Sequence, residues 1–399
     1  MIQAESDYRR QLNQSSNVIV VKVGSRILTN NGRVDLGQIQ SLARQLAMLQ
    51  DEGRQVCLVS SGAVGTAMTI LDTDRPTGLG SLQAYAAIGQ AELIHHYNRE
   101  FEKYNKRAAQ VLLTLEDMSH RRRYLNLRNT IFSLFDLGAI PIINENDCVA
   151  TEEIAVTFGD NDRLAANVAM LVDADLLVIL SDVDAVYDQD PATDGAKRVS
   201  FVEEVDETLL NFAQSNAGAA RSFSKGGMHS KLQSAKIASS VGIPAIIAGG
   251  REPEVLGSIV DGKQVGTLVA GSLPSKNRGD TRDPSGNPRR KTTSSRKRWI
   301  KSAIDIPGSF IVDQGASQAV CELGKSLLPI GILSLTGEFD AGELVKIVDE
   351  QGKTIGKGIS NYSSSEANLI LGCRSAEFVD KLGRVTNEEM IHRDNLVLE

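Results

Sequence analysis

The chain has 399 residues, a formal net charge of −7, 41% hydrophobic residues and 23% charged residues. These proportions are typical of a globular protein, and no apolar run approaches the roughly 18 residues that a membrane-spanning helix needs. Its four cysteines show no C-x-x-C spacing, which argues against a disulfide framework and against a zinc site. We therefore expect a cytoplasmic protein without a membrane segment, whose length favours two domains and whose acidic charge gives nucleic acid no general attraction.

Residues 1–16 mix charged and polar side chains and lack the apolar stretch of a secretory signal, so they are predicted to be a flexible N-terminal tail. The next segment, residues 17–25, is an apolar strand that Gly24 and Ser25 end. Lys22 interrupts this strand near its end. We expect its side chain to project at the carboxyl edge of the sheet, because a buried strand rarely contains a lysine.

Apolar residues spaced by three and four from Ile39 to Leu49 predict an amphipathic helix that ends at Gly53. A second strand, residues 56–59, runs into Ser60-Ser61-Gly62-Ala63. Small residues that open a helix leave backbone N–H groups free to bind an anion. The alternative is a tight turn from strand to helix without a ligand.

The alternation of strands and helices continues through the next two hundred residues. It predicts, for residues 17–271, an α/β domain of three αβα layers around a mainly parallel sheet. The predicted segments are helices at 82–104 and 124–137, strands at 109–113, 139–143, 175–180 and 243–248, and an edge strand at 265–269.

Two polar clusters stand at element ends within this domain: Asn144-Glu145-Asn146-Asp147 and Gly159-Asp160-Asn161-Asp162. The first follows an apolar strand, and open α/β sheets bind ligands at the carboxyl ends of their strands. The second precedes a helical pattern. Each cluster alone could be only a turn or a helix cap, but capping needs one side chain and not a group of them. Residues 150–158, between the clusters, are rich in β-formers and predict a small hairpin at the site.

A glycine-rich and serine-rich segment, residues 215–227, breaks the alternation and ends in Lys225-Gly226-Gly227-Met228-His229-Ser230-Lys231 before another helix. A glycine turn that leads to a lysine at a helix start suits a phosphate group. It is not a Walker loop. The other similar stretch, Gly324-Lys325-Ser326, has Ala319 where a P-loop needs its first glycine.

Residues 272–298 are rich in Pro, Gly, Ser and Thr and carry nine basic residues against Asp280 and Asp283, so they are predicted to be a basic flexible linker. Residues 299–393 contain short strands among glycines and predict a small, mostly-β second domain.

Two lysines at one rim, a glycine-rich loop, helix N-termini and several carboxylates are the groups that phosphoryl transfer needs. The five histidines have no metal-binding spacing, so a metal in this protein should be Mg²⁺ that arrives with a nucleotide.

Five motifs together resemble the glutamate 5-kinase family of the amino acid kinase superfamily. They are Val21-Lys22-Val23-Gly24-Ser25, Ser60-Ser61-Gly62-Ala63, Asn144-Glu145-Asn146-Asp147, Gly159-Asp160-Asn161-Asp162 and Gly226-Gly227-Met228-x-x-Lys231. The tail, with Arg296-Lys297-Arg298-Trp299-Ile300 and Ser326-Leu327-Leu328-Pro329, is similar to the PUA domain of that family. The resemblance covers about residues 17–392 and implies an amino acid kinase fold followed by a PUA domain.

The resemblance implies that ATP phosphorylates the side-chain carboxylate of L-glutamate, the first step towards proline. It implies catalytic roles for Lys22, Asp162 and Lys231, and glutamate binding by Ser61, Asp147 and Asn161. Nucleotide binding falls to Lys22, Ser181, Asp182, Lys225, Gly226, Gly227, Met228, His229, Ser230 and Lys231. No side chain is assigned as a direct metal ligand. Inhibition by proline and a homo-oligomer also follow from the resemblance.

The sequence departs from the family pattern at three places: Ser181 replaces a threonine, Lys225 replaces a small polar residue, and the linker is longer and more basic. Two alternatives stay open. One is another kinase of the superfamily, acting on a different carboxylate or on carbamate. The other is an RNA-binding PUA protein, against which the acidic net charge and the 5% aromatic content argue.

Overall fold

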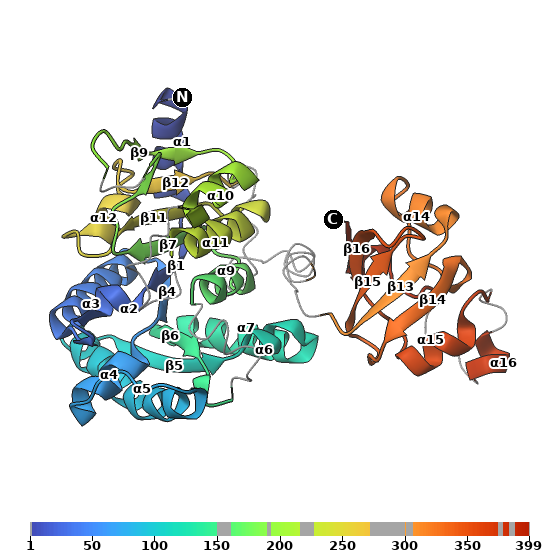
Figure 1. Cartoon of the computed structure of the whole chain (residues 1–399), viewed down its shortest axis with the longest axis horizontal. Helices are drawn as coiled ribbons and strands as arrows, with labels where there is room; N and C mark the ends of the chain where they lie inside the picture. The colour runs from blue at the N-terminus through green and yellow to red at the C-terminus, as the bar shows by residue number, and fades with distance from the viewer. Residues whose placement is uncertain are drawn as a thin grey trace. The chain divides into compact units, whose positions relative to one another are not determined.

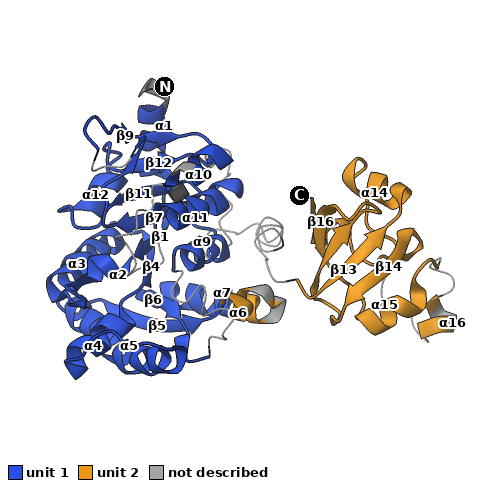
Figure 2. Ribbon diagram, viewed as in Figure 1, with its two compact units in different colours: residues 1–114, 127–279 blue, residues 115–126, 280–399 orange. Residues whose placement is uncertain are grey.

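The computed structural model describes residues 2–149, 161–189, 193–215, 227–271, 300, 306–373, 378–382 and 388–398. The predicted hairpin at 150–158 and the predicted linker at 272–298 lie outside these residues. The chain divides into two compact units, residues 1–114 with 127–279 and residues 115–126 with 280–399 (Figure 2). No helix in the described part of the chain is both long enough and apolar enough to cross a bilayer.

The first unit is built on an eight-stranded sheet in the described residues (Figure 1). Its strands are β1 (Val18–Val23), β4 (Gln55–Ser60), β5 (Arg107–Leu113), β6 (Ala139–Glu145), β7 (Leu176–Ser181), β10 (Phe201–Val202), β11 (Ala245–Gly249) and β12 (Thr267–Val269). The spatial order is β10-β12-β11-β7-β1-β4-β6-β5, and β12 is the strand that pairs antiparallel, with β11. The predicted mainly parallel sheet is confirmed.

The expectation that residues 265–269 form the edge strand is wrong. In the structure β10 pairs with the outer side of β12, with Phe201 opposite Leu268. A strand of two residues leaves no periodic pattern in the sequence, so its pairing partner could not be found from local composition.

The helices of the first unit cover both faces of this sheet (Figure 1). They are α1 (Ile2–Ser15), α2 (Ser25–Leu28), α3 (Leu36–Asp51), α4 (Ala63–Leu71), α5 (Leu79–Glu102), α7 (Arg121–Asp136), α9 (Asn161–Leu171), α10 (Glu207–Ser215), α11 (Met228–Ser240) and α12 (Val255–Val260). Of α7, residues 127–136 belong to this unit and residues 121–126 to the second. The 3₁₀ turn η1 (Asp147–Val149) follows β6, and the hairpins β2 (Thr29–Asn30) with β3 (Arg33–Val34) and β8 (Val186–Tyr187) with β9 (Arg198–Val199) lie outside the sheet. The three-layer αβα arrangement is as predicted.

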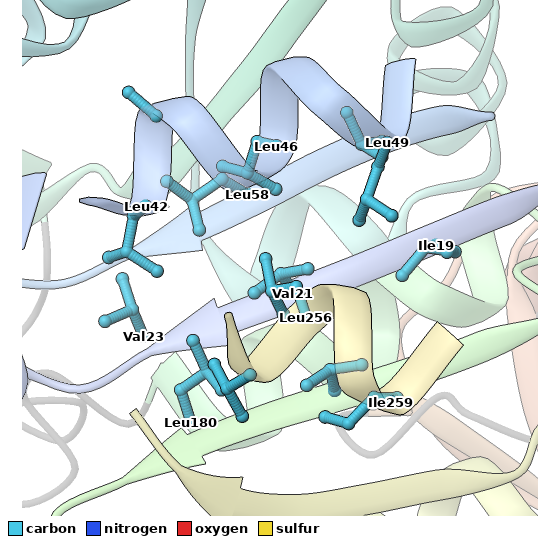
Figure 3. Packing of buried hydrophobic residues seen from close by; sticks show 14 of the residues in the cluster. Ile19, Val21, Val23, Leu42, Leu46, Leu49, Leu58, Leu180, Leu256 and Ile259 are labelled. Carbon is cyan, nitrogen blue, oxygen red and sulfur yellow. The ribbon is translucent and has the colours of Figure 1, made fainter. Parts of the chain in front are cut away.

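Side-chain alternation along β1 decides which face each residue joins. Ile19, Val21 and Val23 are fully buried in a core cluster with residues of α3 and α12 (Figure 3). Burying each such side chain stabilises the fold by about 1.5–3 kcal/mol. Because successive residues of a strand point to opposite faces, Lys22 must point to the other face, which α9 covers.

The expectation of a flexible tail at residues 1–16 is wrong, because α1 packs on the first unit. Tyr8 and Leu12 join the core cluster, and the buried Arg9 Nε donates to Glu5 Oε1 at 2.9 Å. The Arg9 guanidinium also donates to backbone carbonyls of Ser200, Lys263, Val265 and Gly266. Glu5 with Arg9 and Tyr8 with Leu12 each have the four-residue spacing of one helix face. This spacing indicates a helix, but the prediction of a tail relied on the polar composition of the segment.

The second unit has its own sheet in the order β14-β13-β15-β16-β17 and its own hydrophobic core. The strands are β13 (Gly308–Val312), β14 (Ile332–Gly337), β15 (Leu344–Val348), β16 (Thr354–Ile359) and β17 (Leu396–Leu398). The helix α6 (Leu115–Ser119) also belongs to this unit. Its other helices and 3₁₀ turns are α14 (Gln314–Cys321), η2 (Pro329–Gly331), α15 (Ser364–Ile370), α16 (Phe378–Leu382) and η4 (Arg393–Asn395). A small, mostly-β unit was predicted here and is confirmed.

Candidate active site

The carboxyl ends of β1, β4, β6 and β7 border a cavity of about 1100 Å³. Because these strands are parallel, the polar residues that follow them meet at one edge of the sheet. The structure brings eight of the predicted site residues to this cavity: Lys22, Ser61, Asp147, Asn161, Asp162, Ser181, Asp182 and Lys231.

Asp162 is the centre of a buried charge cluster. It lies in the first turn of α9 and pairs with the ammonium of Lys22, which reaches it from β1. Lys231 in α11 places its Nζ 3.9 Å from Asp162 Oδ2, and the Ser230 hydroxyl donates to the same oxygen at 2.7 Å. The side chains of Lys22 and Lys231 are 6% and 7% exposed. Two cations thus share one carboxylate, which leaves an excess positive charge for an anionic ligand.

Burial alone raises the pKa of Asp162, but the charges of Lys22 and Lys231 outweigh it and hold the pKa below its ordinary value. The pKa of Lys231 is lowered from its ordinary value, first by burial, against the opposing attraction of Asp162. The carboxylate is therefore ionised at neutral pH and fixes the positions of both ammonium groups.

Beside this cluster, Asn161 forms a chain of buried amides. Its Nδ2 donates to the Ser61 hydroxyl at 2.8 Å and to Asn144 Oδ1 at 3.0 Å, while Asn144 Nδ2 donates to Gln90 Oε1 at 2.8 Å. These bonds fix the orientation of the Asn161 side chain. Its Oδ1 is buried and accepts no hydrogen bond from the described residues. Such an acceptor, left unpaired, is available to an N–H donor on a ligand.

Two of these hydrogen-bonded amides, Asn144 and Gln90, are not among the site residues predicted from the sequence. Asn144 belongs to the first polar cluster and could have been singled out there. Gln90 lies in the middle of α5, where nothing in the helical pattern separates it from other polar residues.

Asp147 lies in η1, just beyond β6, and is 9% exposed. Burial, and then the charge of Glu145, raise the pKa of Asp147 to about 7. The carboxyl group is thus partly protonated near neutral pH. A cationic ligand beside it would favour the ionised form. Such a ligand would therefore bind more tightly as the pH rises and a larger fraction of Asp147 is ionised.

The residues predicted to bind a nucleotide lie at the ends of β7 and α11. The Ser181 hydroxyl donates to Asp182 Oδ1 at 3.2 Å, and both residues line the cavity. Gly227, Met228, His229 and Ser230 lie at the start of α11, and none of them is among the described lining residues. The His229 ring lies 3.0 Å from the Leu210 carbonyl, in α10. Lys225 and Gly226 lie outside the described residues.

Metal binding by the protein alone requires several carboxylates, imidazoles or thiolates at one point. Among the described residues no group of three or more His, Cys, Asp or Glu side chains could hold a metal ion. The Asp162 carboxylate is already neutralised by two lysines.

The chain is similar to known proteins over most of its length. A model of the amino acid kinase family matches residues 17–249, and a PUA domain model matches residues 308–382. A glutamate 5-kinase of Caldanaerobacter subterraneus subsp. tengcongensis is 45% identical over 383 residues, 95% of this chain and 97% of that protein. Glutamate 5-kinases of Rhodopirellula baltica and Moorella thermoacetica are 42% and 41% identical, over 98% and 99% of this chain and 96% and 99% of theirs. The resemblance inferred from the motifs is confirmed: the chain belongs to the amino acid kinase family, carries a PUA domain, and has glutamate 5-kinases as relatives over nearly its whole length.

Proposed function

We propose that this protein transfers the γ-phosphoryl group of ATP to the side-chain carboxylate of L-glutamate, the first step of proline biosynthesis from glutamate. The observation that supports this best is the buried set Lys22, Asp162 and Lys231 at the carboxyl ends of parallel strands. The same cavity is lined by the Asp147 carboxylate, the Ser61 hydroxyl and the Asn161 amide, groups that suit an amino acid. The full-length likeness to glutamate 5-kinases adds the substrate.

In this reaction an oxygen of the glutamate side-chain carboxylate forms a bond to the γ-phosphorus, and the bond from that phosphorus to the β–γ bridging oxygen breaks. The products are L-glutamyl 5-phosphate and ADP. Lys22 and Lys231 offset the repulsion between two anions and stabilise the charge on the transferred group. Asp162 does not react; it holds both ammonium groups in place.

Glutamate binding falls to Ser61, Asp147 and Asn161 in this proposal. The Asp147 carboxylate faces the ammonium group, and the Ser61 hydroxyl donates to the α-carboxylate. The ammonium also donates a hydrogen bond to the buried Asn161 Oδ1, an acceptor that the described residues leave unpaired.

ATP would occupy the side of the cavity formed by Ser181 and Asp182, with residues 225–231 around its phosphates. An ATP-dependent kinase uses a divalent metal ion, and we propose that Mg²⁺ enters on the phosphates and reduces their negative charge. We also propose, from the family likeness, that the protein is a cytoplasmic homo-oligomer that proline inhibits.

The test is ADP release measured with glutamate, aspartate, N-acetylglutamate and carbamate as acceptors. We expect release that depends on glutamate and is at most weak with the other three. A preference for one of the others would assign the chain to a different kinase of the superfamily. RNA binding in a salt-sensitive gel shift, without any acceptor-dependent ADP release, would favour the RNA-binding alternative.

Asp147→Asn should raise the KM for glutamate about 10- to 30-fold and leave the KM for ATP nearly unchanged, because about 1.5–2 kcal/mol of ion-pair energy is lost at the ammonium alone. The KM of the unmodified protein should rise as pH falls from 8 to 6, because Asp147, with its pKa raised to about 7, becomes protonated in that range. The variant should show no such rise. Steady-state kinetics across this range measure both effects, and an equal change in the KM for ATP would move Asp147 to the nucleotide site.

A further inference from the structure

Arg26 lines the cavity at the carboxyl ends of the parallel strands, although nothing in the sequence pattern predicts it as a site residue. It belongs to α2, the short turn that follows β1, and lines the cavity together with Lys22 and Lys231. Its Nη1 lies 2.9 Å from Asp182 Oδ2, and the two side chains are 34% and 37% exposed. The pair therefore stands at the rim of the cavity, accessible to a ligand.

The backbone beneath Arg26 is held in place. Arg251 donates from Nη2 to the carbonyl oxygens of Arg26 and Thr29, each at 3.1 Å. A guanidinium has five N–H donors, and in the described residues the Arg26 side chain uses only Nη1, towards Asp182. It can therefore keep this bond and still donate to a second acceptor within the cavity.

The electrostatics of the rim also favour an anionic ligand. The pKa of Lys231 is lowered first by burial, and the positive charge of Arg26 adds a small effect in the same direction. Burial raises the pKa of Asp182, but the Arg26 hydrogen bond and the charge of Lys231 outweigh it. Arg26 and the two lysines are thus three cations that pair with two carboxylates, Asp162 and Asp182, in a cavity that Asp74, Arg75 and Asp147 also line.

We propose that Arg26 is a further nucleotide-binding residue, which bridges Asp182 and the phosphates of the nucleotide that are not transferred. This inference rests on the proposed nucleotide site. Arg26 pairs with Asp182, at the proposed nucleotide side, and lines the same cavity as the two lysines that are proposed to act on the transferred group. A planar guanidinium suits this place, because it can bind a carboxylate and a phosphate at once, which a single ammonium does less well.

The first test is calorimetric binding of ATP, ADP, AMP and adenosine to Arg26→Gln and Arg26→Lys in the full chain, with a divalent metal present. We expect Arg26→Gln to weaken ATP and ADP about tenfold and adenosine not at all, with Arg26→Lys in between, and glutamate affinity unchanged. Arg44→Gln is the matched control, since Arg44 pairs with Glu254 at a similar exposure on α3 and does not line the described cavity. An equal loss for adenosine and ATP would overturn the proposal.

The second test separates a phosphate contact from mere neutralisation of Asp182. If Arg26 only neutralises that carboxylate, the double variant Arg26→Gln/Asp182→Asn should bind ATP as well as Asp182→Asn does, and the proposal is wrong. If Arg26 contacts phosphate, the double variant should be about tenfold weaker than Asp182→Asn. The two proposals can fail separately. If Arg26→Gln weakens ATP and ADP but not adenosine, while the protein releases no ADP with glutamate, the role of Arg26 is supported and only the assignment of glutamate as substrate is rejected.

Discussion

Lys231→Ala and Lys22→Ala should each lower kcat about a hundredfold, whereas the affinity for glutamate should change little. Both ammonium groups are fixed by Asp162 before any ligand arrives, so they need no reorganisation when charge shifts onto the transferred group. Removing one such preorganised cation costs about 3 kcal/mol of transition-state stabilisation. The loss should fall on kcat because the ground-state ligands keep most of their other contacts.

Steady-state kinetics give kcat, and calorimetry gives the glutamate Kd. Lys236→Ala is the control, because Lys236 also lies in α11 but pairs with Glu207 at the surface. It should behave as the unmodified protein does. An intact kcat in both active-site variants would contradict the assignment of these lysines.

Asp162→Asn should lower the free energy of unfolding by about 3 kcal/mol and abolish most of the activity. The substitution keeps the shape of the side chain but leaves two buried ammonium groups without their carboxylate, and uncompensated buried charge is strongly destabilising. Urea unfolding followed by circular dichroism measures the effect. Asp261→Asn, in an exposed pair with Lys263, is the control and should cost less than 1 kcal/mol.

A second variant shows whether charge is the cause. Adding Lys231→Met to Asp162→Asn removes one of the two unpaired cations, so part of the lost stability should return although activity does not. Should the double variant be less stable than Asp162→Asn, the loss would come from packing or hydrogen bonding at Asp162 rather than from its charge.

Much of the site could be predicted because its residues carry local signals. Lys22 interrupts an apolar strand, and Asp162 stands in the first turn of a helical pattern, so each could be placed at an element end. The parallel sheet then brings those ends together. Asp147 could be found in the same way, from its place directly after an apolar strand.

Other residues carry no such signal. Gln90 reaches Asn144 from the middle of α5, and this contact depends on how that helix packs against β5 and η1. Arg26 is one basic residue in a turn, which is usually solvated, and its pairing with Asp182 needs β1 and β7 to be neighbours. Local sequence patterns predict the strands and helices but not the order of the strands in the sheet. Contacts between residues of different elements therefore could not be predicted.

The packing of α1 affects how the protein folds while the ribosome is still synthesising it. The Tyr8 hydroxyl accepts a hydrogen bond from the backbone N–H of Gly271 at 2.8 Å, across a separation of 263 residues. Arg9 is likewise held by carbonyls near the end of the same unit. Because α1 is synthesised before the rest of its unit, it must wait for the last segment of that unit before these contacts can form. At about 5–20 residues per second, synthesis leaves this helix without its native partners for tens of seconds, a period in which its apolar side is open to chaperones.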